Sequence, residues 1–399
     1  MTSPLLELRN LSKSYGSVVA VDRVSVSLAA GEFLSFLGPS GSGKTSTLAM
    51  IAGLVEPSSG EILLKSRPLN PLPPYRRNIG MVFQNYALFP HMTVTKNIAF
   101  PLEMRRMPRS EINARVARVL SLVGLENYGP RLPSQLSGGQ QQRIALARAM
   151  VFEPPLLLMD EPLGALDKKL REQMQLEIKQ LHRNLGMSII YVTHDQDEAL
   201  TMSDRIAVFN NGRIEQIGLA SELYEEPATR FVANFIGETN MFSGTVTDVA
   251  RGHCLISSGQ LRLRARHRSG IKQGQTVFVA VRPERTLLSD PHSPAENMEN
   301  VVTGDVSELI YLGKSRKYVI RVAGCAQITA LQQITGSGSA AFSIGDPVAV
   351  HWKAADAVTI ADSVLGAAAL DVVTHSEPSG SRQGALRLGE YRALEQPSR

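Results

Sequence analysis

The sequence predicts an α/β domain built on a parallel sheet, followed by a smaller all-β domain. Over the first 240 residues, short continuous apolar runs alternate with helical patterns, which is typical of parallel strands buried on both faces. From Phe242 onward the expected strands are short, alternate in polarity and contain many glycines. A chain of 399 residues is also longer than a typical single domain.

Four apolar runs are the expected parallel strands of the first domain, at residues 33–37, 156–159, 189–192 and 206–209. Between about residues 85 and 155 the pattern becomes helical, with helices expected at 109–123 and 140–151 and no strong strand signal between them. We interpret this stretch as a helical subdomain inserted into an α/β domain that spans residues 1–240.

The second domain is expected over residues 241–365, where a weak internal repeat is visible. The repeat predicts two copies of a small β unit within one barrel-like domain, and chance matching of valine-rich strands is the alternative. The end of the chain, residues 376–399, is polar, and we expect a disordered tail over 366–399. The matched positions pair Gly244 with Gly304, Val246 with Val306, Gly274 with Gly345, Val277 with Val348, Val279 with Val350 and Val281 with Trp352.

The composition is that of an ordinary globular protein, with 43% apolar and 20% charged residues and a formal net charge of +5. This mild charge does not argue for nucleic acid, and a basic surface near anionic lipid fits it equally well. Two cysteines, Cys254 and Cys325, form no CxxC pattern, which disfavours a zinc or disulfide framework. We expect no signal peptide at the N-terminus. The sequence has no apolar run of 18 residues, so a transport role would require a separate chain to form the pore.

Residues 38–45 read Gly-Pro-Ser-Gly-Ser-Gly-Lys-Thr and fit the phosphate-loop pattern G-x-x-x-x-G-K-[ST]. An apolar strand precedes the loop and a helix follows it, so backbone N–H groups and the helix N-terminus can hold phosphate. Lys44 is expected to neutralise the β- and γ-phosphates of a nucleotide, and the Thr45 hydroxyl to bind Mg²⁺. The candidate nucleotide-binding residues here are Gly38, Pro39, Ser40, Gly41, Ser42, Gly43, Lys44, Thr45 and Ser46.

The apolar run 156–159 ends in two acids, Asp160 and Glu161. A buried strand delivers such residues to the carboxyl edge of the sheet, near the phosphates. Asp160 is expected to hold Mg²⁺, directly or through water, and Glu161 to act as the general base on the attacking water. Alone, this pattern favours a solvated helix N-cap. Beside a complete phosphate loop, it favours catalysis.

Residues 136–140, Leu-Ser-Gly-Gly-Gln, are followed by Gln-Gln-Arg-Ile-Ala-Leu-Ala-Arg-Ala, and the sequence here resembles the ABC ATPase family. The resemblance covers residues 5 to about 238. It implies that this signature closes over the ATP held by a partner's phosphate loop, whereas an ordinary capped helix is the structural alternative. The implied nucleotide contacts are Ser137, Gly138, Gly139 and Gln140.

Four further residues match motifs of the same family. Gln84 resembles the glutamine that reaches magnesium or the lytic water, and His194 the switch histidine that contacts the γ-phosphate. Asp167 resembles the acid of a loop that crosses the dimer interface, and a helix N-cap is a compatible role. Tyr15 resembles the aromatic residue that stacks on adenine, with an ordinary turn or core tyrosine as the alternative.

The resemblance implies an active ATPase that binds ATP and Mg²⁺ and forms a head-to-tail dimer. It also implies two transmembrane permease subunits, an indirect extracytoplasmic solute-binding protein, and a peripheral position on the cytoplasmic face of the inner membrane. No nucleic-acid partner is expected. The Gln84 loop and the helical subdomain are expected to grip a permease, and residues 86–89 form either a docking groove or part of the subdomain core.

Residues 281–284, Val-Arg-Pro-Glu, resemble the transport-associated OB-type domain of importer ATPases. Residues 235–240 resemble spermidine/putrescine (polyamine) importer ATPases. Ferric-iron, sugar and glycerol-phosphate importers remain alternatives, because related subunits share nearly all of these motifs. The β-rich extension disfavours the motor of an exporter. The single ATPase cassette disfavours a soluble ABC ATPase that acts on ribosomes or nucleic acid.

Overall fold

The structure is a computed structural model that describes residues 3–164, 166–250, 252–292, 297–323, 327–334 and 342–361. The predicted tail at 366–399 and Cys325 lie outside these residues. Among those it describes, no helix combines the length and the apolar character that crossing a membrane requires.

A six-stranded sheet with the order β10-β9-β3-β8-β7-β6 forms the centre of the first part of the chain. All neighbouring pairs are parallel except β10, which lies antiparallel at one edge. The strands are β3 (Phe33–Leu37), β6 (Gly80–Val82), β7 (Leu156–Asp160), β8 (Ser188–Thr193), β9 (Arg205–Asn210) and β10 (Arg213–Gly218).

Successive residues of the central strands enter two different hydrophobic cores. On β3, Phe33 packs in one core, and Leu34 and Phe36 pack in the other. On β8, Tyr191 packs in the same core as Phe33, and Ile190 packs in the other core. Because both faces of the sheet are covered, every position on these strands tolerates an apolar residue, and the sequence shows continuous runs.

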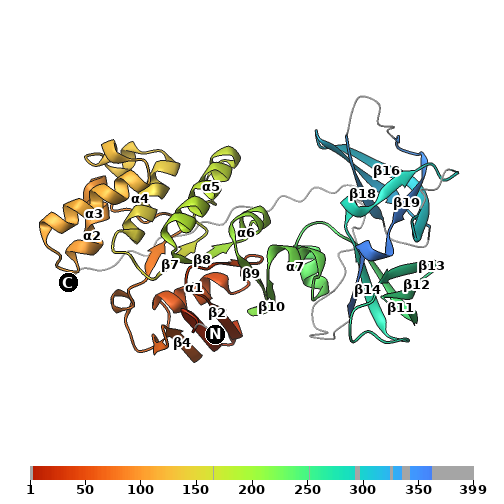
Figure 1. Cartoon of the computed structure of the whole chain (residues 1–399), viewed down its shortest axis with the longest axis horizontal. Coiled ribbons are helices and arrows are strands. Elements are labelled where there is room, and N and C mark those ends of the chain that lie inside the picture. The colour runs from red at the N-terminus through yellow and green to blue at the C-terminus, as the bar shows by residue number, and fades with distance from the viewer. Residues whose placement is uncertain are drawn as a thin grey trace, which may run out of the picture. The chain divides into compact units, whose positions relative to one another are not determined.

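Helices surround this sheet. Over the described residues 85–155, the expected insertion contains helices and no strand, and Figure 1 shows α2, α3 and α4 gathered as one group. Its first helix, α2, contains Pro101 and is absent from the sequence-based prediction. The helices are α1 (Lys44–Ala52), α2 (Val94–Glu103), α3 (Arg109–Leu122), α4 (Gly138–Met150), α5 (Lys168–Leu185), α6 (Gln196–Met202), α7 (Ala220–Glu225) and α8 (Arg230–Phe235). Short 3₁₀ turns occupy Pro74–Arg76, Glu126–Tyr128, Pro133–Gln135, Pro283–Arg285 and Ala354–Asp356.

A second, antiparallel sheet has the order β2-β1-β4-β5, with two strands before the phosphate loop in the sequence and two after α1. Its strands are β1 (Leu6–Tyr15), β2 (Val18–Leu28), β4 (Ser59–Leu64) and β5 (Arg67–Pro68). Leu6, Leu8 and Leu11 are buried, whereas Glu7 is partly exposed and Arg9 is exposed. The register shifts between Leu8 and Leu11, so the polar alternation of a one-sided sheet is interrupted by a bulge.

The C-terminal part consists of a closed barrel, β11-β12-β13-β20-β14, and a five-stranded sheet, β15-β19-β16-β17-β18. One hydrophobic core joins them, and Phe242 of the barrel stacks on Trp352 of the sheet with ring centroids 5.7 Å apart. The strands are β11 (Asn240–Ala250), β12 (His253–Ser258), β13 (Leu261–Arg266), β14 (Thr276–Val281), β15 (Leu287–Ser289), β16 (Asn300–Tyr311), β17 (Ser315–Arg321), β18 (Ile328–Gln333), β19 (Pro347–Trp352) and β20 (Ala357–Ala361).

The strand pairing confirms the internal repeat. In the barrel Gly244 lies opposite Val277, and in the sheet Gly304 lies opposite Val348. Each glycine passes so close to the neighbouring strand that a Cβ atom would lie 2.6 Å or 2.4 Å from a backbone oxygen. The close approach requires glycine at both positions.

The Val-Arg-Pro-Glu segment follows β14. The Arg282 side chain is 94% buried, since its exposed fraction is 6%. Its guanidinium donates hydrogen bonds to the carbonyl oxygens of Ala233, Glu238 and Tyr224, at 2.8, 3.2 and 3.1 Å. Burial of this group lowers the pKa of Arg282, and the three carbonyls accept hydrogen bonds from its two terminal nitrogens.

Candidate nucleotide-binding site

The predicted phosphate loop connects β3 to α1 and depends on glycine at two positions. Gly43 has φ +99°, and a Cβ atom there would lie 2.5 Å from the Ala20 carbonyl oxygen. A Cβ atom on Gly38 would lie 2.3 Å from the Phe209 carbonyl oxygen. The loop is therefore wedged between β2 and β9, and only glycine allows its backbone to turn there.

Lys44 begins α1 and its side chain lies within the loop. The ammonium group donates to the carbonyl oxygens of Gly38 and Pro39, both at 2.8 Å. Burial lowers the pKa of Lys44, and the carboxylates of Glu161 and Asp160 act in the opposite direction. A cation held at a helix N-terminus by backbone oxygens is suited to a polyphosphate.

The Thr45 hydroxyl donates to Asp160 Oδ1 at 3.1 Å, which joins the start of α1 to the end of β7. Burial raises the pKa of Asp160, against the opposing effect of the Thr45 hydrogen bond. In the part of the chain described, no cluster of three or more His, Cys, Asp or Glu side chains could hold a metal. A hydroxyl with one carboxylate nevertheless fits Mg²⁺, which commonly completes its shell with water and substrate phosphates.

Glu161 lies beside both other candidate catalytic residues. Its Oε1 is 3.2 Å from His194 Nδ1, and its Oε2 accepts a hydrogen bond from Gln84 Nε2 at 3.4 Å. These three residues follow the adjacent strands β7, β8 and β6, so parallel pairing brings them to one edge. The Glu161 backbone has φ +43°, the left-handed region that a glutamate rarely adopts.

His194 is more accessible to solvent than Glu161. Its side chain is 55% exposed, compared with 19% for Glu161. Asp160 stands next to Glu161 in the chain, so the metal-binding and proton-accepting candidates lie at the same strand end. The structure thus brings together five predicted residues from four separate segments of the sequence: Thr45, Gln84, Asp160, Glu161 and His194.

Tyr15 ends β1 and pairs with Val18 across the β1–β2 turn. Half of its surface is exposed, and the Lys13 ammonium lies 5.1 Å from the ring centroid. The same hairpin supplies Ala20, whose carbonyl abuts Gly43. The ring is therefore on an exposed surface of the hairpin that borders the phosphate loop, and it is not a core tyrosine.

Ser137 is the N-cap of α4, and Gln140 completes a capping box with it. The Ser137 hydroxyl accepts from the Gln140 N–H at 3.4 Å, and Gln140 Oε1 accepts from the Ser137 N–H at 3.0 Å. Ser137 and Gly138 are exposed. Within the described ranges, no hydrogen bond or ion pair links this signature to the phosphate loop of the same chain.

Asp167 is the N-cap of α5, because its Oδ1 accepts from the Leu170 N–H at 3.0 Å. The capping role considered from the sequence is therefore present. The run 86–89 belongs mostly to the helical core: Tyr86 is 7% exposed and Leu88 packs against the same cluster. A docking groove formed by this whole run is disfavoured because its larger side chains already have intramolecular neighbours.

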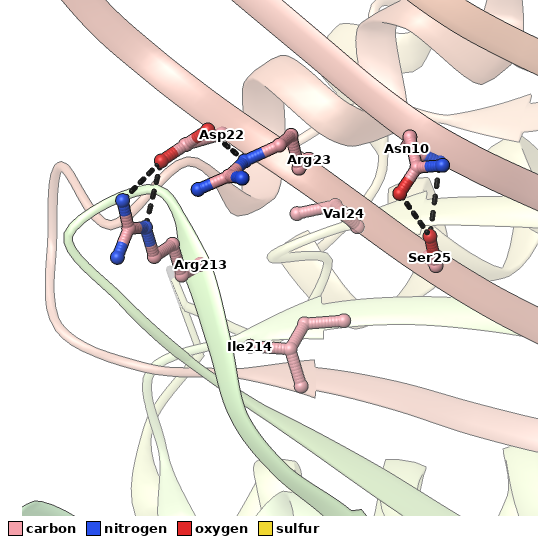
Figure 2. A pocket seen from close by; sticks show the side chains of 7 residues that line it. All are labelled: Asn10, Asp22, Arg23, Val24, Ser25, Arg213 and Ile214. Carbon is pink, nitrogen blue, oxygen red and sulfur yellow. Dashed lines mark hydrogen bonds and ion pairs between the residues drawn. The ribbon is translucent and has the colours of Figure 1, made fainter. Parts of the chain in front are cut away.

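A groove of about 430 Å³ is lined by residues of β1, β2 and β10, among them Asp22, Arg23 and Arg213. Figure 2 shows Arg23 and Arg213 turned towards the Asp22 carboxylate, with distances of 3.1 and 2.7 Å. The Asp22 N–H donates to the Gly212 carbonyl, and the Gly212 N–H donates to the Ser42 carbonyl. The Asp22–Arg213 pair thus joins β2 to the start of β10, and the Gly212 N–H joins the β9–β10 turn to the phosphate loop. No sequence motif indicates these contacts.

A complete phosphate loop, an acidic strand end and a converging glutamine and histidine on one parallel sheet define a P-loop ATPase. The ABC transporter family matches residues 21–164, and the TOBE domain family matches residues 279–360.

Two similar proteins are spermidine/putrescine import ATP-binding proteins PotA. The one from Rubrobacter xylanophilus is 49% identical over 88% of this chain and 92% of its own length, and the one from Acidothermus cellulolyticus is 46% identical over the same shares. CbiO1 from Clostridium perfringens, part of an ABC transporter complex, is a solved structure with TM-score 0.52 and 29% identity, covering 56% of this chain and 92% of that one. This chain belongs to the ABC transporter family, as one of its ATPase subunits.

Proposed function

We propose that this ATPase subunit forms a head-to-tail dimer and powers import of a polyamine through two separate permease chains at the cytoplasmic face of the membrane. The observation that carries the proposal is the Glu161 carboxylate, which contacts both His194 and Gln84 beside the Thr45–Asp160 pair. This arrangement supports hydrolysis of a nucleoside triphosphate rather than binding alone.

Glu161 is the general base. Its carboxylate lies at the carboxyl edge of the sheet, where it can accept a proton from a water that attacks the γ-phosphate. Gln84 donates its amide N–H to Glu161, which leaves the amide oxygen to orient that water. With Nδ1 of His194 against Glu161, the Nε2 edge of the ring is available to the γ-phosphate.

The remaining residues hold the nucleotide. Lys44 and the loop N–H groups bind the β- and γ-phosphates, and the half-exposed Tyr15 ring supports the adenine base. Thr45 and Asp160 would hold Mg²⁺, which neutralises phosphate charge when bound. Ser137 and Gly138 are exposed at the start of α4, so the Ser137 hydroxyl and the free N–H groups of this helix start suit the γ-phosphate on a second copy of the chain.

Two relatives, 49% and 46% identical to this chain, are named spermidine/putrescine import ATP-binding proteins. The similarity of this chain to them supports a polyamine substrate. Ferric iron, sugar and glycerol phosphate are the alternatives. The ATPase itself binds nucleotide, so solute selection resides in the permease and in an extracytoplasmic solute-binding protein.

The test is to reconstitute this chain with its copurifying permeases and solute-binding protein in proteoliposomes, and to measure ATP hydrolysis and radiolabelled uptake. Spermidine or putrescine should stimulate both, and Lys44→Ala should abolish both. Stimulation by a sugar, glycerol phosphate or ferric iron instead would reject the polyamine assignment but keep the importer. Recovery of ribosomes or nucleic acid without permeases would reject import.

A further inference from the structure

One arginine joins the two loops that flank the candidate catalytic cluster. Arg171 lies in the first turn of α5, immediately after the loop that contains Asp167. Its guanidinium donates to the Leu166 carbonyl oxygen at 3.0 Å and to Asp195 Oδ2 at 3.1 Å. Leu166 precedes Asp167, and Asp195 follows His194, so a single side chain spans from one loop to the other.

A buried carboxylate completes the connection. Glu198 is 3% exposed, and its Oε2 accepts hydrogen bonds from the hydroxyls of Thr193 and Tyr191, at 2.7 and 2.8 Å. The other carboxylate oxygen of Glu198 lies 3.8 Å from Arg171 Nε. This Nε is buried and lacks a hydrogen-bond partner, so the attraction to Glu198 compensates only in part for its burial.

These contacts determine the backbone around His194. Thr193 is bound to Glu198, and its hydroxyl also accepts from the Asp195 N–H at 2.9 Å. Asp195 is in turn bound to Arg171. The imidazole itself is 55% exposed, and its Nδ1 lies 3.2 Å from Glu161 Oε1. The position of the ring therefore depends on a backbone that is held from both sides.

We propose that Arg171 is a positioning residue for hydrolysis: it holds His194 against Glu161 and couples the position of His194 to the loop before α5. The inference rests on the proposed roles of Glu161 and His194. Because the guanidinium bonds both loops through separate nitrogens, a displacement of the Leu166 carbonyl moves the anchor of Asp195. A lysine retains the charge but lacks the fork that reaches both loops.

The first test compares Arg171→Ala and Arg171→Lys with Arg183→Ala. Arg183 lies near the other end of α5, is exposed and has no ion pair in the described part of the chain, so it controls for loss of charge. We expect Arg171→Ala to lower kcat by about tenfold or more, with the KM for ATP changed less than about twofold. Arg171→Lys should give an intermediate kcat, and Arg183→Ala should match the wild type.

The second test is a double-mutant cycle with His194→Ala. If Arg171 acts through His194, adding Arg171→Ala to His194→Ala should lower kcat by less than about twofold further. Multiplied effects, an unchanged kcat in Arg171→Ala, or a loss confined to ATP affinity would each overturn the proposal. A His194→Ala enzyme with full turnover would instead overturn the role of His194 itself, which separates the two failures.

If Arg171→Ala does not fold, Asp195→Asn tests the same positioning role. An asparagine can still accept the Glu198 N–H at the start of α6, but it lacks the charge that Arg171 binds. We expect kcat to fall by about two- to fivefold at unchanged ATP affinity. Wild-type turnover in both Asp195→Asn and Arg171→Lys would contradict the positioning role.

Discussion

At the scale of the residue, the site concentrates strain and burial where the chemistry is proposed to occur. Glu161 keeps a left-handed backbone, φ +43°, and its N–H donates to the Val192 carbonyl of β8 at 3.0 Å. Such a conformation costs about 1–3 kcal/mol and persists only when its surroundings enforce it. Here it turns the carboxylate towards Gln84 and His194.

Replacing Glu161 with glutamine tests the proposed base. Glu161→Gln preserves the size of the side chain and leaves the phosphate loop intact, but it removes the proton acceptor. We expect kcat to fall by about 10³-fold, with ATP affinity retained and an ATP-bound dimer trapped. Single-turnover hydrolysis and light scattering with Mg²⁺·ATP measure the two effects. Wild-type turnover would mean that another group accepts the proton.

We expect the Asp160 carboxylate to lower the stability of the folded protein at neutral pH. Burial raises its pKa above 3.8, so the folded state binds the proton more tightly than the unfolded state. The group therefore favours folding at low pH, and this contribution is lost as the pH rises through the folded-state pKa. At neutral pH the buried carboxylate carries a cost that Asp160→Asn removes.

We expect Asp160→Asn to raise the Tm of the nucleotide-free protein by about 2 °C at pH 7, with a smaller gain near pH 4, while Mg²⁺-dependent turnover is lost. Differential scanning calorimetry at the two pH values measures the difference. A lower Tm at pH 7 would show that the carboxylate stabilises the fold.

At the scale of the element, parallel strands were predictable because their sequence pattern is local. The run 33–37 coincides with β3, and 156–159 differs from β7 by one residue. Helix α2 was missed because Pro101 within it is a signal against a helix, and packing of Ile98 and Leu102 in the core overrides that signal. The sheet that contains β1 was missed because its bulge breaks the alternation.

The parts of the candidate site also differ in whether they could be predicted from the sequence. The phosphate loop and signature were predictable because each motif is contiguous in sequence. The contact of Gln84 with Glu161 and the Arg171 connection depend on pairing between remote segments, and no spacing along the chain reveals them. Their catalytic roles, and the domain boundary at 240, stay predictions.

The C-terminus of α1 depends on Arg77, which is 4% exposed. Its guanidinium donates to the carbonyl oxygens of Met50, Ile51 and Leu72, at 2.7, 2.9 and 2.9 Å. The helix that carries Lys44 at its start thus has its final carbonyls satisfied by a distant side chain.

We expect Arg77→Ala to destabilise the protein by about 2–3 kcal/mol, because buried carbonyls lose their donors. The matched control is Arg76→Ala, since Arg76 is adjacent and exposed and its guanidinium lies 5.7 Å from the centroid of the exposed Tyr75 ring. Urea unfolding of both variants measures the difference. Equal stabilities for the two would mean that water replaces the guanidinium at no cost.

At the scale of the whole molecule, the C-terminal part is built from two related units that hold each other. Asn240, at the start of the barrel, exchanges two hydrogen bonds with the backbone of Thr329 in the sheet, at 2.8 and 2.7 Å. Asn300, at the equivalent start of the sheet, exchanges two with the backbone of Arg264 in the barrel, at 2.9 and 2.7 Å. The repeat predicted from glycine and valine spacing extends to this reciprocal asparagine contact, which the sequence comparison did not include.

This symmetry predicts that either asparagine stabilises the joint between the units without affecting catalysis. Asn300 is 1% exposed, so Asn300→Ala removes two partly buried hydrogen bonds and leaves the N–H and the carbonyl of Arg264 without this partner. We expect a loss of about 2–4 kcal/mol, seen as a lower unfolding temperature of the β-rich part. Asn240→Ala should cost a similar amount, while the control Thr303→Ala, exposed on the same strand as Asn300, should cost little.

Calorimetry combined with an ATPase assay below the transition measures both properties in the full chain. Turnover should stay at the wild-type level, because the core that Asn300 supports contains none of the residues of the nucleotide site. If Asn300→Ala instead lowered kcat in a fully folded sample, the β-rich part would act on the ATPase cycle through the joint between its two units. That result would place a regulatory connection at the Asn300–Arg264 contact.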